Sequence, residues 1–211
     1  MVKFVNVNLN GKTEVNLELN ECEFSYLSYK NEDEKNLFLQ MLTKVSLPKK
    51  GSIIIGGEDF TSSKRGWKII MRKLGITYDD YKFISYKTII ENLEYYLNLR
   101  GYTDEESKRL SLEVLEFFNL TNKRDDFVAN LTQEEKHYFS LARALSSEPS
   151  YLVMDEFHKG LNKQNIKKVF LLLEELCKNG LGIMYITNDN TILENYPKKL
   201  NMLGEGVIKN V

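Results

Sequence analysis

The sequence predicts an α/β fold with a mixed or parallel sheet at its core, an antiparallel N-terminal β-subdomain and a helical subdomain. The first observation is an alternation of short apolar segments with amphipathic segments of helical length. Such an alternation is typical of parallel strands connected by helices. The second is that residues 81–145 have an almost entirely helical pattern. We therefore expect one domain, in which residues 1–80 and 146–211 form the core with its β-subdomain and residues 81–145 the helical subdomain.

The elements follow from the local pattern. Near the N-terminus apolar and polar residues alternate, and Asn10-Gly11 predicts a turn between two antiparallel strands. A buried strand ending at Leu27 precedes a polar turn and a helix from about Lys35. Thr103, with Glu106 three residues later, predicts a helix start. Further helices are predicted over 64–73, 88–99, 104–118, 133–145, 163–178 and 189–195. Further strands are predicted over 51–57, 74–78, 151–156 and 182–187, with a final pair about Gly204-Glu205-Gly206.

The composition narrows the classes of partner. Lys and Arg number 29 against 30 Asp and Glu, so no net positive charge indicates a nucleic acid or an anionic lipid surface. No apolar stretch approaches the roughly 20 residues that cross a bilayer, and the N-terminus lacks the pattern of a signal peptide. Cys22 and Cys177 are expected to be buried free thiols. The composition thus favours a soluble cytoplasmic protein that binds no nucleic acid.

Residues 25–42 have the order strand, loop, helix that holds nucleotides in loops of the form G-x-x-x-x-G-K-[ST]. In that frame the loop runs from Tyr29 to Asn36, and Lys35 is the residue that matches. Glycines in such a loop let backbone N–H groups converge on phosphates at a helix N-terminus. Tyr29 and Glu34 occupy both glycine positions. The segment is therefore either a nucleotide site that has lost its chemistry or a loop of unrelated origin.

Several further segments resemble one family when they are taken in order. They are GSIIIGGEDF, LGITYDD, TIIENLEYYLNLRGY, LTQEEKHYFSLARALSSEPSYLVMDEF, HKGLN and YITND. Over nearly the whole chain, their order and spacing resemble the ATP-binding subunits of ABC transporters, most closely the FtsE, LolD and MacB type. The longest segment is similar to the family's signature motif, the helix after it and the Walker B strand. The resemblance implies a P-loop NTPase fold of the ABC type, in which two subunits hold ATP between them.

Most positions that carry this family's chemistry differ here. Asn36 stands in place of the hydroxyl residue that ligates magnesium, and Asp79 in place of the glutamine near the metal and the attacking water. Asn188 replaces the histidine that contacts the γ-phosphate. Residues 132–134, Thr-Gln-Glu, replace the signature Ser-Gly-Gly, and no aromatic residue lies near residues 7–9 to stack on adenine. The resemblance therefore implies that ATP would find neither half of its usual site.

Asp155 and Glu156 are the exception, because they match the magnesium-organising acid and the catalytic base of Walker B. One interpretation is general-base hydrolysis of ATP. The other is structural: the acids bond neighbouring loops, or Asp155 pairs with Lys35 in an empty site. We favour the second, because residues 32–34 place carboxylates where a triphosphate would lie. We expect no catalytic residue, no metal and no cofactor, with ATP and magnesium bound only under the first interpretation. We expect vestiges of the family's catalytic residues at four positions: Asp155, Glu156, Asn188 and Asp79. We expect vestiges of its cofactor-binding residues at three: Lys35, Asn36 and Asp155.

Aromatic residues gather where the family receives a short cytoplasmic helix of its membrane subunit. The residues expected to bind a partner there are Tyr78, Tyr81, Tyr86, Tyr95 and Tyr96, since tyrosine is frequent in binding hot spots. Phe83 is expected in the core of the helical lobe. The prediction is a non-catalytic subunit, or pseudo-ATPase, peripheral on the inner face of the cytoplasmic membrane. Its partner would be an integral, FtsX-like permease, and it would act alone, as a homodimer or beside an active ABC ATPase. The alternatives are a weakly active ATPase and a regulator without a permease.

Overall fold

The computed structural model describes residues 1–64, 66–203 and 206–210. The strands are β1 Val2–Asn8, β2 Glu14–Leu19, β3 Phe24–Ser28, β4 Ser52–Ile55, β5 Glu58–Asp59, β6 Leu74–Thr77, β7 Tyr151–Asp155, β8 Gly182–Ile186, β9 Lys199–Met202 and β10 Gly206–Asn210. The α-helices are α1 Glu32–Leu42, α2 Trp67–Arg72, α3 Ile89–Leu99, α4 Asp104–Phe117, α5 Gln133–Leu145, α6 Lys163–Lys178 and α7 Asn190–Asn195. Short 3-10 turns cover Thr121–Lys123 and Val128–Asn130.

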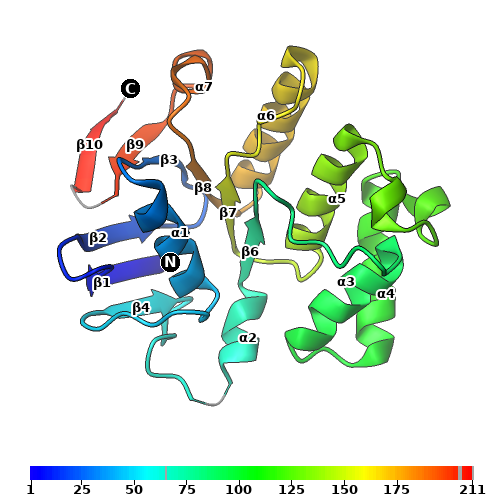
Figure 1. The fold of residues 1–211 in the computed structure, drawn as a ribbon, viewed down its shortest axis with the longest axis horizontal. Helices are drawn as coiled ribbons and strands as arrows, with labels where there is room; N and C mark the ends of the chain where they lie inside the picture. Colours follow the sequence, from blue (N-terminus) through cyan, green and yellow to red (C-terminus); the bar gives the residue numbers. More distant parts are fainter. Residues whose placement is uncertain (65, 204–205, 211) are drawn as a thin grey trace.

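The strands form two sheets. Sheet A has the order β2-β1-β4-β5, and all its neighbours are antiparallel. Sheet B has the order β10-β9-β3-β8-β7-β6, in which β9, β3, β8, β7 and β6 are parallel and β10 is antiparallel to β9. Figure 1 shows sheet A and the helices α3 to α5 on opposite sides of sheet B. The predicted α/β fold is therefore confirmed.

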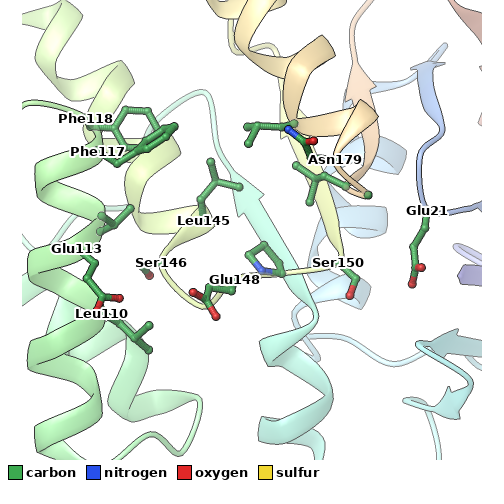
Figure 2. A pocket seen from close by; sticks show the side chains of 15 residues that line it. Glu21, Leu110, Glu113, Phe117, Phe118, Leu145, Ser146, Glu148, Ser150 and Asn179 are labelled. Carbon is green, nitrogen blue, oxygen red and sulfur yellow. The ribbon is translucent and has the colours of Figure 1, made fainter.

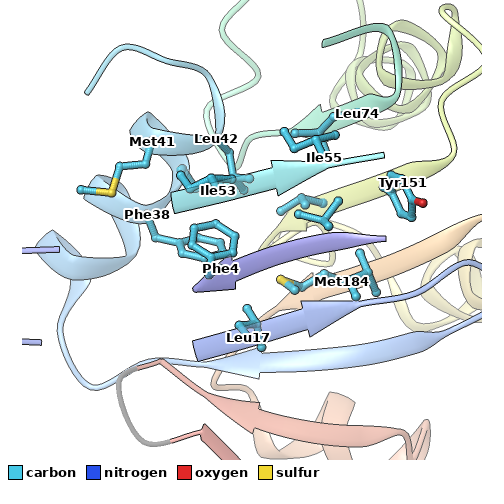
Figure 3. Close-up of a cluster of buried hydrophobic side chains, with 14 of the residues drawn as sticks. Phe4, Leu17, Phe38, Met41, Leu42, Ile53, Ile55, Leu74, Tyr151 and Met184 are labelled. Atoms are coloured by element: carbon cyan, nitrogen blue, oxygen red, sulfur yellow. The ribbon is translucent and has the colours of Figure 1, made fainter. Parts of the chain in front are cut away.

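The largest hydrophobic core joins the two sheets through α1 (Figure 3). Phe4 of sheet A stacks on Phe38 of α1 with ring centroids 4.7 Å apart. Met184 and Tyr151 enter the same core from sheet B. Because burial of apolar surface is the main force that favours folding, this core fixes α1, and the loop before it, against the end of sheet B.

The helices α3, α4 and α5 have a hydrophobic cluster of their own, and Phe83 packs against it as expected. Each begins at a threonine whose hydroxyl accepts a hydrogen bond from the third helical residue, a glutamate that bonds back to the cap. The start predicted at Thr103 is thereby confirmed. Such capping boxes satisfy two backbone N–H groups that a helix start would leave unpaired, so the positions of these helix starts are strongly specified.

The structure differs from the sequence expectations at the start of α1 and at Cys22. The first helix begins at Glu32 rather than at Lys35, because Asn31 caps it one turn earlier. Cys22 is exposed rather than buried, since it lies in the turn before β3, whereas Cys177 is buried as expected. The expected final strand pair is present as β9 and β10, but residues 204 and 205 of its turn lie outside the described residues. None of the described helices combines the length and apolar character that a membrane span requires.

Candidate functional site

The candidate site lies at the edge of sheet B where its parallel strands end. Tyr29 follows β3, Glu156 follows β7, and Thr187 and Asn188 follow β8. The strand β8 pairs in parallel with β3 on one side and with β7 on the other. Parallel pairing brings the carboxyl ends of these strands to one edge. The four residues therefore lie together beside the first turn of α1.

The loop between β3 and α1 has three residues, and the helix starts inside the frame of the predicted phosphate loop. The side chain of Asn31 accepts a hydrogen bond from the Asp33 N–H at 2.8 Å. The Asn31 carbonyl accepts one from the Lys35 N–H at 3.1 Å. Two of the N–H groups that a phosphate loop would offer to a nucleotide are thus already bonded within the chain.

Of the three acidic residues at the start of α1, Glu32 and Glu34 have side-chain partners. They lie at the positive end of the helix dipole, where carboxylates are stabilising. Glu32 pairs with Lys35 one turn further along the helix. Glu34 accepts hydrogen bonds from Asn10 Nδ2 at 2.8 Å and from the Thr13 hydroxyl, which ties α1 to the turn between β1 and β2. These carboxylates occupy the electrostatic position that a phosphate would take.

Lys35 and Asp155 form a buried ion pair. Lys35 is 1% exposed, and its Nζ lies 3.0 Å from Asp155 Oδ1. Burial by itself lowers the pKa of Lys35, but hydrogen bonds to Glu32 and Asp155 outweigh it, so the pKa is raised. Burial also raises the pKa of Asp155, to about 6, although the ammonium group opposes this shift. Loss of hydration therefore disfavours the charged form of Asp155 within this pair.

Tyr29, at the position of the family's first glycine, contacts two strand ends. Its hydroxyl donates a hydrogen bond to Glu156 Oε1 at 2.8 Å, and its ring centroid lies 5.2 Å from Lys35 Nζ. Its N–H donates to Asn188 Oδ1 at 3.0 Å, and its carbonyl accepts from Asn188 Nδ2 at 2.7 Å. The second oxygen of Glu156 accepts from the Thr187 hydroxyl at 3.0 Å. Both oxygens of the residue in the catalytic-base position are therefore engaged within the chain.

His158 belongs to this site, although the sequence analysis did not identify it. Its Nε2 lies 3.2 Å from Asp189 Oδ2 and 3.7 Å from Glu156 Oε2. Its Nδ1 lies 3.2 Å from the Tyr185 hydroxyl. Burial lowers the pKa of His158 despite the two carboxylates. Its place in HKGLN, directly after the Walker B segment, is the sequence signal that could have indicated it.

The segment 132–134, at the family's signature position, starts α5. The Thr132 hydroxyl accepts from the Glu135 N–H at 3.3 Å, and the Glu135 carboxylate accepts from the Thr132 N–H at 2.8 Å. Gln133 Nε2 donates to the Tyr81 hydroxyl at 2.7 Å. Although residues 132–134 are exposed, Thr132 therefore caps α5 and Gln133 holds Tyr81 in the segment after β6.

A groove of about 810 Å³ lies between α1 and the segment that follows β6. Its carboxylates include Asp79, which is exposed, and Asp80, which pairs with Lys82 at 2.5 Å. Asn36 and the largely exposed Val45 also line it. Glu32 and Asp155, the partners of Lys35, line the groove as well, and so does Tyr78 of the predicted partner-binding residues.

The tyrosines predicted to bind a partner differ in exposure. Tyr86 is 77% exposed and Tyr95 is 46% exposed. The other three are half-buried: Tyr78, Tyr81 and Tyr96. Tyr81 is held by Gln133 and by His137, whose Nδ1 lies 2.9 Å from the tyrosine hydroxyl. The structure thus offers two of the five tyrosines as free surface and holds the others within the fold.

The fold and this edge together define a cassette of the P-loop NTPase class, with a helical lobe between β6 and β7. A family model described as "ABC transporter" matches residues 13–159, which is more than half of the chain. The chain therefore belongs to the ABC transporter family, as the resemblance of its sequence segments implied.

Individual relatives agree with this assignment. The cell division ATP-binding protein FtsE of Bacillus subtilis is 26% identical over 201 residues, which cover 95% of this chain and 87% of FtsE. The methionine import ATP-binding protein MetN 2 of Acinetobacter baylyi is 28% identical over 206 residues, which cover 92% of this chain and 60% of MetN 2. The chain thus spans about three fifths of that second relative.

Solved structures show the same fold. A dimeric ATP-binding cassette in a post-hydrolysis state, bound to ADP and Pi, has a TM-score of 0.79 at 22% identity and covers 99% of this chain and 97% of its own. An ATP-binding subunit of an ABC transporter has a TM-score of 0.81 at 20% identity, and the match covers 99% of this chain and 88% of that one. The predicted ABC-type cassette fold is confirmed.

Proposed function

We propose that this chain is a non-catalytic subunit of the ABC type, a pseudo-ATPase, that acts by docking on an integral membrane, permease-like partner. The partner would be FtsX-like, and the subunit would lie on the inner face of the cytoplasmic membrane, alone, as a homodimer or beside an active ABC ATPase. The observation that carries the proposal is the hydrogen bond from the Tyr29 hydroxyl to Glu156. Through this bond a side chain of the protein itself occupies the residue at the catalytic-base position.

The residues around Lys35 do not fit a triphosphate and its magnesium ion. An anion could reach the ammonium group only by displacing Asp155 and Glu32 from it. A carboxylate left about 4 Å from a phosphate oxygen would cost on the order of 4 kcal/mol at an effective dielectric of about 20. Asn36 offers an amide where the metal needs a hydroxyl oxygen. These features favour a site that holds α1 against sheet B over one that binds a nucleotide.

Calorimetric titration of the purified chain with Mg-ATP, extended to millimolar nucleotide, tests the first half of the proposal. We expect no saturable heat and no rise in melting temperature, because the site is already bonded internally. Saturable binding that Lys35→Ala abolishes would overturn the pseudo-ATPase. A thermal shift with Mg-ATP would report the same binding independently, since a ligand of the native state stabilises it.

A restored variant makes a negative result informative. Tyr29→Gly, Glu32→Ser, Glu34→Gly and Asn36→Ser together rebuild the glycine, lysine and hydroxyl pattern of a phosphate loop. We expect this variant to gain Mg-ATP binding that the parent lacks, and to lose it again on Lys35→Ala. If the restored variant binds no better than the parent, the cause of any failure to bind lies outside the loop.

The alternative function, a weakly active ATPase, is favoured by one feature: Asp155 and Glu156 are both present at the end of β7. Under this alternative the Tyr29 side chain must leave Glu156 before a general base is free. Phosphate release that disappears in Glu156→Gln, with unchanged melting temperature, would support it. Equal release by both proteins would identify a contaminating ATPase.

The second half of the proposal concerns docking. Tyr86→Ala with Tyr95→Ala removes the two exposed rings among the predicted partner-binding tyrosines, and we expect at least a fivefold loss of co-sedimentation with inverted membrane vesicles that carry the permease. Phe127→Ala is a matched control, because Phe127 is 48% exposed on the same helical lobe. Undiminished sedimentation of the double variant, or an equal loss in the control, would contradict docking through these tyrosines.

A further inference from the structure

A second cavity, of about 650 Å³, lies at the opposite edge of sheet B, where β7 and β8 begin. Figure 2 shows Phe117 and Phe118, at the end of α4, across from Leu145 at the end of α5. Leucines from the end of α6 and the segment after it close the other side: Leu176 and Leu181. The cavity therefore separates the helical lobe from the core at a place remote from Tyr29 and Glu156.

Part of the apolar lining of this cavity is exposed to solvent and does not belong to a hydrophobic core. The ring of Phe117 is 59% exposed, and its edge meets Phe118 with centroids 5.1 Å apart. Leu115, two residues earlier on α4, is fully buried and supplies the contact with the lobe's core. An exposed aromatic ring that lines a cavity marks an interaction site more often than an isolated apolar residue does.

A neighbouring cavity gives the site an elongated shape. It measures about 440 Å³ and shares Phe117 and Phe118 with the first cavity, and it continues to Tyr138 of α5 and Leu172 of α6. The two cavities thus form one groove between the helical lobe and α6, which we call the lobe groove. Its shape suits a stretch of polypeptide better than a compact small molecule.

The charged side chains that line the first cavity are all acidic. Glu21, Glu113 and Glu148 line it, and its lining includes no lysine or arginine in the part of the chain that the structure describes. Glu113 pairs with Arg109, but both side chains are more than half exposed, and such a pair is weak in water. Figure 2 shows the carboxylates of Glu113 and Glu148 below the aromatic rings. The first cavity is therefore complementary to an apolar surface bordered by positive charge, whereas Glu134 and Lys168 both line the neighbouring cavity.

We propose that the lobe groove binds an amphipathic helical segment of a partner protein. The apolar face of that segment, with residues at i, i+3, i+4 and i+7, contacts Phe117, Phe118 and Leu145. Lysine or arginine side chains at one end of it face Glu113 and Glu148. This site is distinct from the groove that Tyr78 and Asp79 line, so one subunit can hold two protein segments at once.

The test uses two synthetic helical peptides that share an apolar face of leucines and differ only in flanking lysines or glutamates. Fluorescence anisotropy with the full chain is expected to show at least tenfold tighter binding of the lysine peptide. Glu113→Lys with Glu148→Lys is expected to remove that preference, because both attractions become repulsions. Glu116→Lys with Glu175→Lys makes the same charge change on exposed positions of α4 and α6 that do not line the first cavity, and it should leave binding unchanged.

Three results would overturn the proposal. They are equal binding of both peptides, an equal loss in the control variant, or full affinity in Phe117→Ala. Sedimentation analysis adds a fourth: if the parent self-associates and Glu113→Lys with Glu148→Lys makes it monomeric, the lobe groove is an interface between two copies of this chain. Each variant's melting temperature, compared with that of the parent, separates loss of binding from loss of folding.

Discussion

The two edges of sheet B differ in how their side chains are used. At the carboxyl edge the Tyr29 hydroxyl donates a hydrogen bond to Glu156, and Lys35 forms a buried ion pair with Asp155. At the amino edge Phe117 and its neighbours line an open groove. The carboxyl edge, which we call the closed edge, has its buried polar side chains bonded within the chain. The amino edge, which we call the open edge, offers apolar side chains to solvent.

The difference separates what holds this fold together from what the fold can bind. Polar groups at the closed edge stabilise the structure only as a complete set, since a buried charge without its partner is costly. Apolar groups at the open edge contribute little to folding while solvent still reaches them. Substitutions at the closed edge should therefore change stability, and substitutions at the open edge should change binding.

The largest expected effect is at Lys35. Lys35→Met leaves Asp155 buried without its cation, and we expect a loss of about 3 kcal/mol in the free energy of unfolding at pH 8, measured by urea denaturation. Adding Asp155→Leu should recover most of that loss, because an apolar pair of similar size needs no partner. A loss below about 1 kcal/mol in the single variant would show that water reaches the pair, and the two edges would then not differ in this respect.

The second effect is a pH dependence of stability from Asp155. Its folded-state pKa is raised to about 6, from an ordinary value of 3.8. Between those values the folded state binds the proton and the unfolded state does not, so this group's contribution to stability increases as the pH falls from about 7 to 4. Relative to Asp155→Asn, the parent should gain about 2 kcal/mol over that range.

Glu135 has the opposite dependence on pH, in a lower pH range. Hydrogen bonds from Lys123 and Thr132 lower the pKa of Glu135 to about 2. Its contribution is complete above pH 4.5 and is lost as the pH falls toward 2, so the sign of its effect is opposite to that of Asp155. If the parent and Asp155→Asn change in parallel between pH 7 and 4, Asp155 does not carry the proposed shift.

Much of the fold could be predicted from the sequence because its signals are local. The cap at Thr103, the apolar stripe of α6 and the buried run of β7 each depend on neighbouring residues, and the elements lie where those patterns indicate. The motif frame predicts an open loop up to Lys35, and it therefore places the start of α1 one turn too late. The local signal at Asn31, an N-cap followed by three acids, predicts the observed start better.

The candidate site was less predictable because its contacts are distant in sequence. The positions of Tyr29 and Glu156 within family motifs are visible in the chain, but their hydrogen bond joins residues 127 positions apart. His158 was missed for the same reason, since its partner Asp189 lies on the next strand's loop. The lobe groove depends on three helices and has no motif at all. Spacing along the chain cannot report which side chains fill a space between elements.

The third effect tests the hydrogen bond from Tyr29 to Glu156 at the carboxyl edge. Tyr29→Phe leaves Glu156 Oε1 without its tyrosine donor, and we expect a loss of about 1–2 kcal/mol in the free energy of unfolding. Tyr86→Phe is the matched control, because its ring is largely exposed and the same change should cost less than about 0.5 kcal/mol. Equal values for the two variants would mean that water replaces the hydroxyl at Glu156, and that the edge is more open than the contacts indicate.

The smallest expected effect on stability is at the open edge. Phe117→Ser should change the free energy of unfolding by less than about 0.5 kcal/mol, since more than half of the ring already faces solvent. Phe118→Ala, at the adjacent residue, should cost about 2 kcal/mol or more, because its half-buried ring packs against the hydrophobic clusters of both lobes. A large loss in Phe117→Ser would mean that this ring supports the fold. The exposed lining of the lobe groove would then have a structural explanation, and the contrast between the two edges would lose its basis.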